Sequence, residues 1–354
     1  METLMRRFVI NTCRLVFYLA FCLNVNSALC LAQPRSPKDE TQSLFDFHSG
    51  FWINLHHFLY LEALSEKPQK GAHPAIVNKA DAETLSSLSE EERATWSAAV
   101  SYYSSAVIQR DLLFDQNMGV IKNQLEDAET SPDLASADMP ASLKAALLKA
   151  APIYRKYWWT RHDAQNQKWI AQLQPLVGKY GEGLKNSLTR IYETPWPGYP
   201  VRVDAAVYAG QFGAYTTDEP TRPTISTTDP ANQGNAALEI VFHETSHGMI
   251  DKVMDTMRSA ETNVNTPNQH GAFRSGTLWH AVLFYTAGEL VAEHIPGYIP
   301  YADKNGLWVR AWPDPDRSLI ERDWKPHMTG AAGLQAALTK LVDDLAAVQR
   351  QNSN

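Results

Sequence analysis

Through most of the first half of the chain, apolar residues recur at intervals of three and four, the spacing of one helix face. This pattern predicts four helical segments, over residues 42–64, over 89–114, from 140, and over 154–192. Ser89 followed by Glu92 is a capping box that supports the start of the second segment. We expect interruptions of the last one near Pro175 and Gly181. Residues 126–138 are acidic, small and non-periodic, which predicts an exposed loop.

The pattern changes in the second half of the chain. Residues 201–208 and 223–228 are β-branched and alternating, which predicts two short strands, with Gly210 and Gly213 marking turns between them. Three more helical segments follow, over residues 235–250, 275–294 and 329–349. Helices, then a small sheet, then helices again predict an α+β fold that is predominantly helical. Alternating β-α units are not indicated.

The first 32 residues have a character of their own. Arginines, among them Arg6 and Arg14, precede the apolar run 15–23, and small residues follow. This order is typical of a secretory signal peptide, and an uncleaved signal-anchor is the alternative. We therefore expect a signal peptide over 1–32, a helical region over 33–194 and a second region over 195–354. The protein is then exported, periplasmic or extracellular, without stable membrane insertion once the leader is removed.

Cysteine content and charge narrow the function classes. All three cysteines lie inside the leader (Cys13, Cys22 and Cys30), so the mature chain would hold no disulfide. It also lacks an Asn-x-Ser/Thr acceptor, and both absences favour a bacterial exported protein. The formal net charge is −7, and the leader carries three Arg against one Glu, so its removal makes the chain more acidic. This balance argues against nucleic acid as a partner.

One short motif contains two candidate metal ligands and a candidate general base. His243 and His247 are four residues apart on a predicted apolar helix, so their imidazoles lie one turn apart and can converge on one metal ion. Two histidines in this arrangement are typical ligands of Zn²⁺. Glu244 lies on the flank of the pair, where it can hold a zinc-bound water and accept its proton. The motif predicts a zinc-dependent hydrolase.

The sequence His243-Glu244-x-x-His247 resembles the zinc-binding helix of the zincin metallopeptidases. In that group a β-strand precedes the helix and forms one wall of the substrate cleft, and residues 223–228 stand where this edge strand would be. The resemblance covers roughly residues 201–327. It implies a zincin-like core, a bound Zn²⁺ and a peptide or protein substrate.

A catalytic zinc usually has three protein ligands, and two residues compete for the third place. Glu289 is similar in position to the gluzincin glutamate on a second helix, and Glu293 then occupies the place of the acid that supports a ligand histidine. His280 follows a Gly-Thr-x-x spacing loosely similar to that of the aspzincins, which have Asp there. Nine residues of continuous helix separate the two by about 13 Å, so both cannot bind one ion. We expect Glu289, with His280 as the alternative.

Further groups could donate a hydrogen bond to the oxyanion that forms during hydrolysis. The candidates are His280, His327, Tyr285, Tyr298 and Tyr301. His327 resembles, in its place after the glutamate helix, the downstream histidine of some gluzincins.

Together these features predict an exported, gluzincin-like zinc metallopeptidase with Glu244 as general base. Two alternatives stay open. One is a zinc hydrolase of a non-peptide amide or ester, and the other is a secreted protein that keeps the metal site without turnover.

Overall fold

A computed structural model describes residues 43–66, 77–112, 115–265 and 273–352 of the chain. The expected signal peptide over 1–32 lies outside these ranges. The described residues belong to one compact unit that extends from Gln42 to Asn354. Within the described ranges, no helix is long and apolar enough to cross a membrane.

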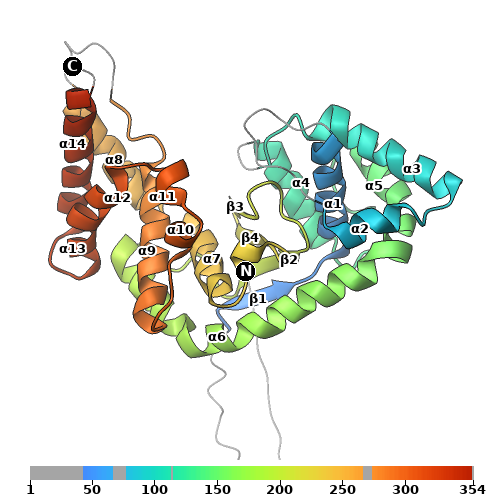
Figure 1. Ribbon diagram of the computed structural model, residues 1–354, viewed down its shortest axis with the longest axis horizontal. Helices are drawn as coiled ribbons and strands as arrows, with labels where there is room; N and C mark the ends of the chain where they lie inside the picture. Colours follow the sequence, from blue (N-terminus) through green and yellow to red (C-terminus); the bar gives the residue numbers. More distant parts are fainter. Residues whose placement is uncertain (1–42, 67–76, 113–114, 266–272, 353–354) are drawn as a thin grey trace, which may run out of the picture. The chain divides into compact units, whose positions relative to one another are not determined.

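A four-stranded sheet lies at the centre of this unit (Figure 1). Its strands, in spatial order, are β1 (Phe45–His48), β2 (Val201–Ala206), β4 (Thr221–Ser226) and β3 (Ala214–Asp218). The first three are parallel, and β3 pairs antiparallel with β4. The register joins Phe45 to Val201, so strands from both ends of a long crossover meet side by side.

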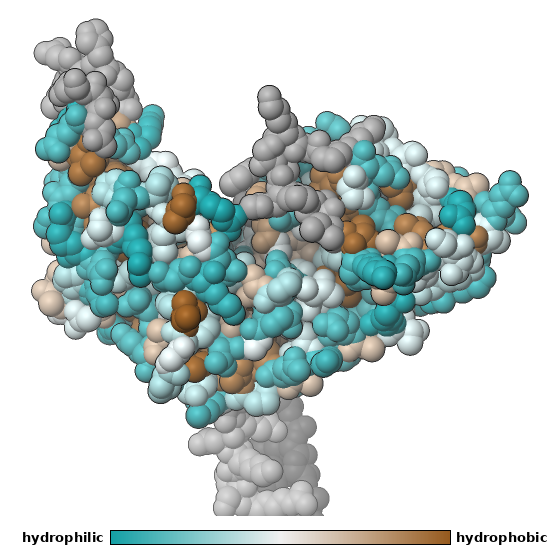
Figure 2. Space-filling model, in the orientation of Figure 1, coloured by the Kyte–Doolittle hydropathy of each residue, from teal (hydrophilic) through white to brown (hydrophobic). Residues whose placement is uncertain are grey.

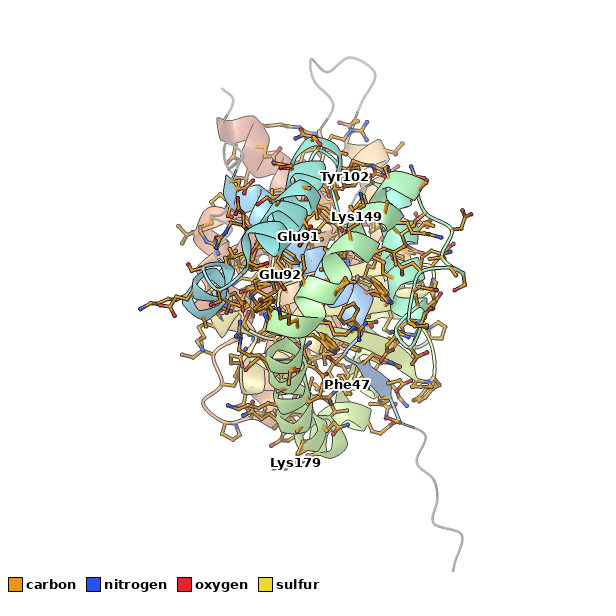
Figure 3. All side chains as sticks on the ribbon, turned by 90° about the vertical axis from the view of Figure 1, so that its right-hand side faces the viewer. Phe47, Glu91, Glu92, Tyr102, Lys149 and Lys179 are labelled. Carbon is orange, nitrogen blue, oxygen red and sulfur yellow. The ribbon has the colours of Figure 1, made fainter. Side chains whose placement is uncertain are left out.

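That crossover contains the helices of the first half. They are α1 (Phe51–Glu66), α2 (Lys79–Leu85), α3 (Glu90–Tyr102), α4 (Gln116–Asp127), α5 (Ala141–Tyr154) and α6 (Thr160–Tyr192). Short π-helical turns follow α3 (Tyr103–Val107) and α5 (Arg155–Trp159). The predicted capping box at Ser89 and Glu92 is present at the start of α3. Figure 3 shows α3 and α5, which pack against each other, with Tyr102 and Lys149 labelled on them.

The helices of the second half carry the predicted motif and its neighbours. They are α7 (Asn235–Ser246), α8 (Asp251–Val264), α9 (Leu278–His294), α10 (Tyr301–Lys304), α11 (Leu307–Arg310), α12 (Asp316–Leu319), α13 (Lys325–Met328) and α14 (Leu334–Asn352). Short 3₁₀ turns lie at Pro230–Asn232 and His247–Met249, and a π-helical turn at Ile320–Trp324. The motif helix α7 packs on β3 and β4 on one side and on α6 and α9 on others. Every residue from Ala236 to Ser246 is consequently buried.

Two hydrophobic clusters stabilise the unit. The first joins β1, α6, the sheet interior and the helices α7 to α9 and α14, and the second joins α1, α3, α4 and α5 to Tyr208 and Tyr215 near the sheet. The two expected regions, 33–194 and 195–354, therefore contribute strands to one sheet. Each hydrophobic cluster contains residues from both regions. On the face shown in Figure 2, hydrophilic residues predominate and apolar ones form separate patches.

Several predicted elements differ from the structure. The expected helix over 42–64 begins with strand β1, because Phe45 and Val201 pair across the chain, and helix starts only at Phe51. Helix α6 continues through Pro175 and Gly181 without a break. In the expected exposed loop over 126–138, Glu126 belongs to the last turn of α4 and is fully buried in an ion pair with Lys122 (2.9 Å). The mostly helical α+β class is confirmed.

The edge strand is the correction that matters most for function. Residues 223–228 were expected to form it, but β4 lies inside the sheet between β2 and β3. The edge next to α7 is instead β3, in the segment where turns were expected. In this strand Ala214, Tyr215 and Thr216 are buried, and exposure increases through Thr217 to Asp218.

Candidate metal centre

The first two histidines of the motif lie where α7 ends. His243 is in the last turn of the helix, and His247 begins the 3₁₀ turn that follows. Their ring centroids are 5.2 Å apart. Gly248 allows this turn to approach the sheet, because a Cβ at that position would lie 2.1 Å from Thr221 Oγ1. A side chain there would push the turn, and His247 with it, away from β4.

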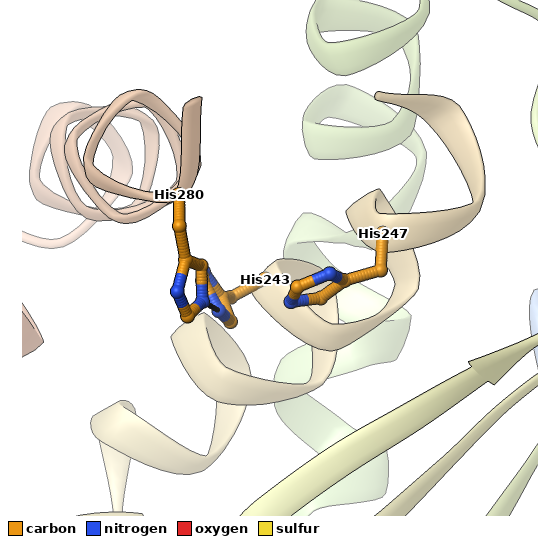
Figure 4. A group of neighbouring side chains, drawn as sticks. All are labelled: His243, His247 and His280. Atoms are coloured by element: carbon orange, nitrogen blue, oxygen red, sulfur yellow. Dashed lines mark hydrogen bonds between the residues drawn. The ribbon is translucent and has the colours of Figure 1, made fainter. Parts of the chain in front are cut away.

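A third histidine completes the group. His280, in the first turn of α9, brings its ring to both others, with centroid separations of 5.2 Å to His243 and 5.1 Å to His247. One ring nitrogen from each residue lies within 4.8 Å of the other two, and the Nε2 atoms of His243 and His280 are 3.2 Å apart. Figure 4 shows the three rings converging from two facing helices. We call His243, His247 and His280 the histidine trio.

These distances fit one metal ion. Imidazole nitrogens bind zinc at about 2.0–2.1 Å, so two of them on a tetrahedral ion lie about 3.3 Å apart. The separation of 3.2 Å between His243 and His280 already has this value. The donor atom of His247 lies within 4.8 Å of the other two. Among the His, Cys, Asp and Glu side chains of the described ranges, the histidine trio is the one group placed to hold a metal.

The charge state of the trio is also that of metal ligands. Burial, followed by the neighbouring His280 and His247, lowers the pKa of His243 well below its usual value. Burial and His280 lower the pKa of His247 to about 3, and burial lowers that of His280 to about 4. All three imidazoles are therefore neutral at physiological pH. A neutral ring nitrogen with a free lone pair is what a metal ion requires.

Glu244 is held by the edge strand. Its carboxylate Oε2 accepts a hydrogen bond from Thr216 Oγ1 (2.7 Å), and the same hydroxyl lies 3.0 Å from the Glu244 carbonyl oxygen. Thr216 belongs to β3, so the strand fixes both the backbone and the side chain of Glu244. Burial raises the pKa of the Glu244 carboxyl to about 7, against the opposing effect of the Thr216 hydrogen bond. An acid with this pKa can both accept and return a proton near neutral pH.

Aromatic rings surround the trio. Phe284 stacks on His243 with centroids 3.7 Å apart, and Trp279 stacks on His280 at 5.1 Å. Trp312 meets His280 edge-on at 5.5 Å, and Tyr301 stacks on Phe284. These rings give the imidazoles a nearly apolar environment, which strengthens electrostatic interactions inside the site.

Glu289, the expected third ligand, is not brought to the trio. Its carboxylate pairs with Lys325 of α13 (2.9 Å), more than two helical turns beyond His280 on α9. Since one continuous helix carries both, the placement of His280 beside His243 keeps Glu289 at a distance. Glu293 is exposed near the end of the same helix and meets no ligand histidine. The geometry replaces Glu289 by His280 as the third member of the group.

Three of the other predicted hydrogen-bond donors, His327, Tyr285 and Tyr298, bond to or lie beside groups outside the trio. Both ring nitrogens of His327 face backbone carbonyls, of Ala332 (3.0 Å) and Ile191 (2.8 Å), so this residue joins α13 to the end of α6. The Tyr285 hydroxyl lies beside Glu289 and Lys325, and burial followed by Glu289 raises its pKa to about 12. Neither belongs to the trio. Tyr298 donates a hydrogen bond to the buried Glu239 (2.7 Å).

Tyr301 is the predicted tyrosine that remains near the site. Its backbone N–H donates to Glu239 (2.8 Å), and its ring stacks on Phe284, which itself covers His243. Glu239 lies one helical turn before His243 and so ties this segment to α7. Burial raises the pKa of Tyr301, and Asp229, Glu244 and Glu239 add to the effect, so its hydroxyl stays protonated as a donor.

Sequence analysis missed Thr216, Glu239 and Phe284. The sequence could have indicated Glu239 as a residue near the site, because an acid four residues before His243 lies on the same helix face. Thr216 and Phe284 had none, since their roles depend on how β3 and α9 pack against α7.

Comparison of the chain with protein-family models, with curated proteins and with solved structures found no match.

Proposed function

We propose that this protein is a zinc-dependent hydrolase that cleaves peptide bonds, with His243, His247 and His280 as zinc ligands and Glu244 as general base. The observation that carries the proposal is the convergence of three neutral imidazoles, with donor atoms within 4.8 Å of one another, beside a buried carboxylate. Three protein ligands leave the fourth tetrahedral position open, which is the arrangement of catalytic rather than structural zinc sites.

The metal supplies part of the chemistry when bound: it polarises a carbonyl and lowers the pKa of water towards neutrality. The protein supplies the proton transfers. Glu244, oriented by Thr216, accepts a proton from the attacking water and returns it to the leaving nitrogen. The raised pKa of about 7 suits both halves of this cycle. Tyr301 is the donor best placed to steady the oxyanion among the predicted tyrosines.

The edge strand supports a peptide as the substrate. Among the strands described, β3 has a partner only on its β4 side, and Thr216 links it directly to the catalytic glutamate. An extended peptide can add to such an edge through main-chain hydrogen bonds. This places its backbone beside Glu244. A zincin-like arrangement, with an edge strand along the motif helix, follows from the proposal.

Metal analysis of the purified protein tests the ligand set. We expect one zinc per chain in the wild type, loss of zinc in His280→Ala, and retained zinc in Glu289→Ala. His294→Ala is the matched control, because His294 lies on the same helix but bonds to the Leu290 carbonyl (2.8 Å). A protein that binds no divalent metal, or loses it in Glu289→Ala while His280→Ala keeps it, would overturn the assignment.

Thermal unfolding gives a second measurement that does not depend on activity. A ligand that binds only the folded state raises stability by about 2.7 kcal/mol at a concentration 100 times its Kd. Zinc should therefore raise Tm in wild type and in His294→Ala, but not in His280→Ala. Assays with peptide libraries and with small amides and esters then separate a peptidase from a hydrolase of smaller substrates. Tight zinc binding without any turnover would support a non-catalytic site.

A further inference from the structure

One buried acid on the motif helix takes no part in the proposed reaction as described so far. Glu239 lies one turn before His243 on α7 and is fully buried. Its Oε2 accepts hydrogen bonds from the Tyr298 hydroxyl (2.7 Å) and from the backbone N–H of Tyr301 (2.8 Å). Its Oε1 has no hydrogen-bond partner among the described residues. Burying a carboxyl group that is only partly hydrogen-bonded is costly, so these two bonds are what the acid contributes. We call residues 298–301 the tyrosine segment.

Both bonds hold the tyrosine segment, which leads from α9 into α10. Tyr301 is the first residue of α10, and the first N–H groups of a helix have no partner inside it. Ile299 is 58% exposed, so the segment faces solvent on its outer side and Glu239 on its inner side. Gly288 of α9 leaves room for this approach, because a Cβ there would lie 2.7 Å from Pro300 Cβ and 3.1 Å from Glu239 Oε1. Helices α7 and α9 and the tyrosine segment therefore meet at one carboxyl group.

The tyrosine segment ends in a ring that packs over the histidine trio. Tyr301 stacks on Phe284 with centroids 5.6 Å apart, and Phe284 stacks on the first histidine of the trio at 3.7 Å. Burial, followed by Asp229 and Glu244, raises the pKa of the Tyr301 hydroxyl, so this hydroxyl lies within electrostatic reach of the general base. The backbone of Tyr301 is thus held by Glu239 while its side chain reaches towards the site.

We propose that Glu239 is a positioning residue for hydrolysis: by holding the tyrosine segment, it places the Tyr301 hydroxyl where the oxyanion forms. The inference rests on the proposed peptidase function and adds to it a residue that acts through another residue, without contacting substrate or metal. A displacement of about 1 Å at a reacting group can cost about 10²-fold in rate. Loss of both bonds should therefore lower kcat and leave KM and the zinc content unchanged.

Two substitutions at Glu239 give the central test. Glu239→Leu removes both acceptor bonds and should lower kcat for a peptide substrate about 10–100-fold, with KM and zinc content at wild-type values. Glu239→Gln keeps one acceptor oxygen for both donors and should restore most of kcat. In a Tyr301→Phe background, Glu239→Leu should cause no further loss, because the hydroxyl that Glu239 positions is already absent. A loss by the same factor in both backgrounds would overturn the proposal.

Hydrogen exchange in the metal-free protein measures the anchoring without turnover. The backbone N–H of Tyr301 should exchange at least about tenfold faster in Glu239→Leu than in wild type, and at the wild-type rate in Glu239→Gln. Glu62→Leu is the matched control. Glu62 is also buried, with one oxygen bonded to Trp96 Nε1 (2.6 Å) and the other without a partner among the described residues, but it lies in the helical half. The control should change neither kcat nor this exchange rate.

Tyr298→Phe removes one of the two bonds and carries the test if Glu239→Leu does not fold. It should lower kcat less than Glu239→Leu does, and it should have no effect in the Tyr301→Phe background. Wild-type kcat in Glu239→Leu, or loss of zinc from that variant, would overturn the positioning role while leaving the peptidase intact. Absence of any peptide cleavage by the zinc-loaded wild type would instead refute the proposed function, and with it the role of Glu239 in catalysis.

Discussion

Two groups of histidines in this protein have different surroundings: one group is fully buried, and in the other His243 is buried and the remaining two are half-buried. In the helical half, His56 bonds to the Tyr103 hydroxyl (2.9 Å) and His57 to the Tyr215 hydroxyl (3.1 Å). His162 lies between the Tyr154 hydroxyl (2.8 Å) and the Asp81 carboxylate (3.0 Å). In the histidine trio, the Nε2 atoms of two imidazoles, His243 and His280, lie 3.2 Å apart.

On this difference we propose to distinguish histidines that stabilise packing from histidines that bind a metal ion. A hydroxyl or carboxylate partner satisfies one nitrogen of His56 and of His57 and both nitrogens of His162, although Nδ1 of His57, like Nδ1 of His243, is buried without a partner. The imidazoles of the trio face one another instead, and their donor atoms are close enough to share one metal ion. Counting histidines, or noting that they are buried, does not distinguish the two groups. The identity of each ring's hydrogen-bond partner does.

The largest effect is expected from Glu244→Gln. Removing the general base while keeping the side-chain shape should reduce hydrolysis by about 10²–10⁴-fold, because positioned proton transfer contributes that much. Zinc content and Tm should stay at the wild-type values. Steady-state kinetics with parallel metal analysis checks this. Full activity in the variant would exclude Glu244 as the base.

The next prediction sets the two histidine groups against each other. His280→Ala should weaken zinc affinity by more than the 10–100-fold typical of a lost supporting residue, with a small effect on the stability of the metal-free protein. His162→Ala should leave zinc binding unchanged but cost about 1–3 kcal/mol of stability, because the buried Asp81 loses a partner. Competition titration and urea unfolding measure the two quantities. Equal changes of zinc affinity and of unfolding free energy in the two variants would contradict the distinction between the two histidine groups.

A smaller effect is expected at Thr216. Thr216→Val removes the hydroxyl that orients the Glu244 carboxylate, and a hydrogen bond to a charged group is worth about 1.5–3 kcal/mol. We expect kcat to fall about 10–100-fold with KM and zinc content unchanged. Thr216→Ser keeps the hydroxyl and should restore most of the rate. A rise in KM alone would mean that Thr216 contacts the substrate rather than positioning the base.

The smallest effect concerns a buried acid away from the metal centre. Burial raises the pKa of Glu62 to about 7, although Trp96 Nε1 donates a hydrogen bond to it (2.6 Å). In the unfolded chain this group ionises near its usual value of 4.5, so the folded state loses stability as pH rises from there to about 7.

Glu62→Gln removes that dependence. The free energy of unfolding of the variant minus that of wild type should increase by about 1–3 kcal/mol when the pH is raised from 5 to 8. Urea unfolding at the two pH values measures the gain, and Glu66→Gln, at an exposed position of the same helix, is the control. An identical pH dependence in Glu62→Gln and wild type would show that Glu62 is not protonated in the folded protein.

Sequence alone was sufficient for the motif helix but not for the rest of the site. The spacing of His243 and His247 is a local property of α7, and the structure bears out their convergence. The sequence does not show that His280, and not Glu289, lies beside this pair, because α9 is buried almost all round, from Leu278 to Val291. Apolar neighbours therefore surround Glu289 as well as His280, and periodicity cannot tell which face meets α7.

Strands β1 and β3 were likewise not predictable from the local sequence pattern. Phe45 and Phe47 continue the apolar spacing of the helix that follows, so β1 has no local signature and depends on its distant partner β2. Strand β3 lies between Gly213 and a turn, and its threonines resemble loop residues. Both strands are fixed by pairing between distant segments, which a local pattern does not contain.

The pairing of β1 with β2 also governs when the protein can fold. Phe45 meets Val201, so every residue of α1 to α6 must leave the ribosome before the sheet can close. Contacts this distant in sequence slow the search for the native state, because the ends of a long loop must meet first. We expect the helices to form early and the sheet to close late. The candidate metal centre, with β3 packed against α7, is then expected among the last parts to form.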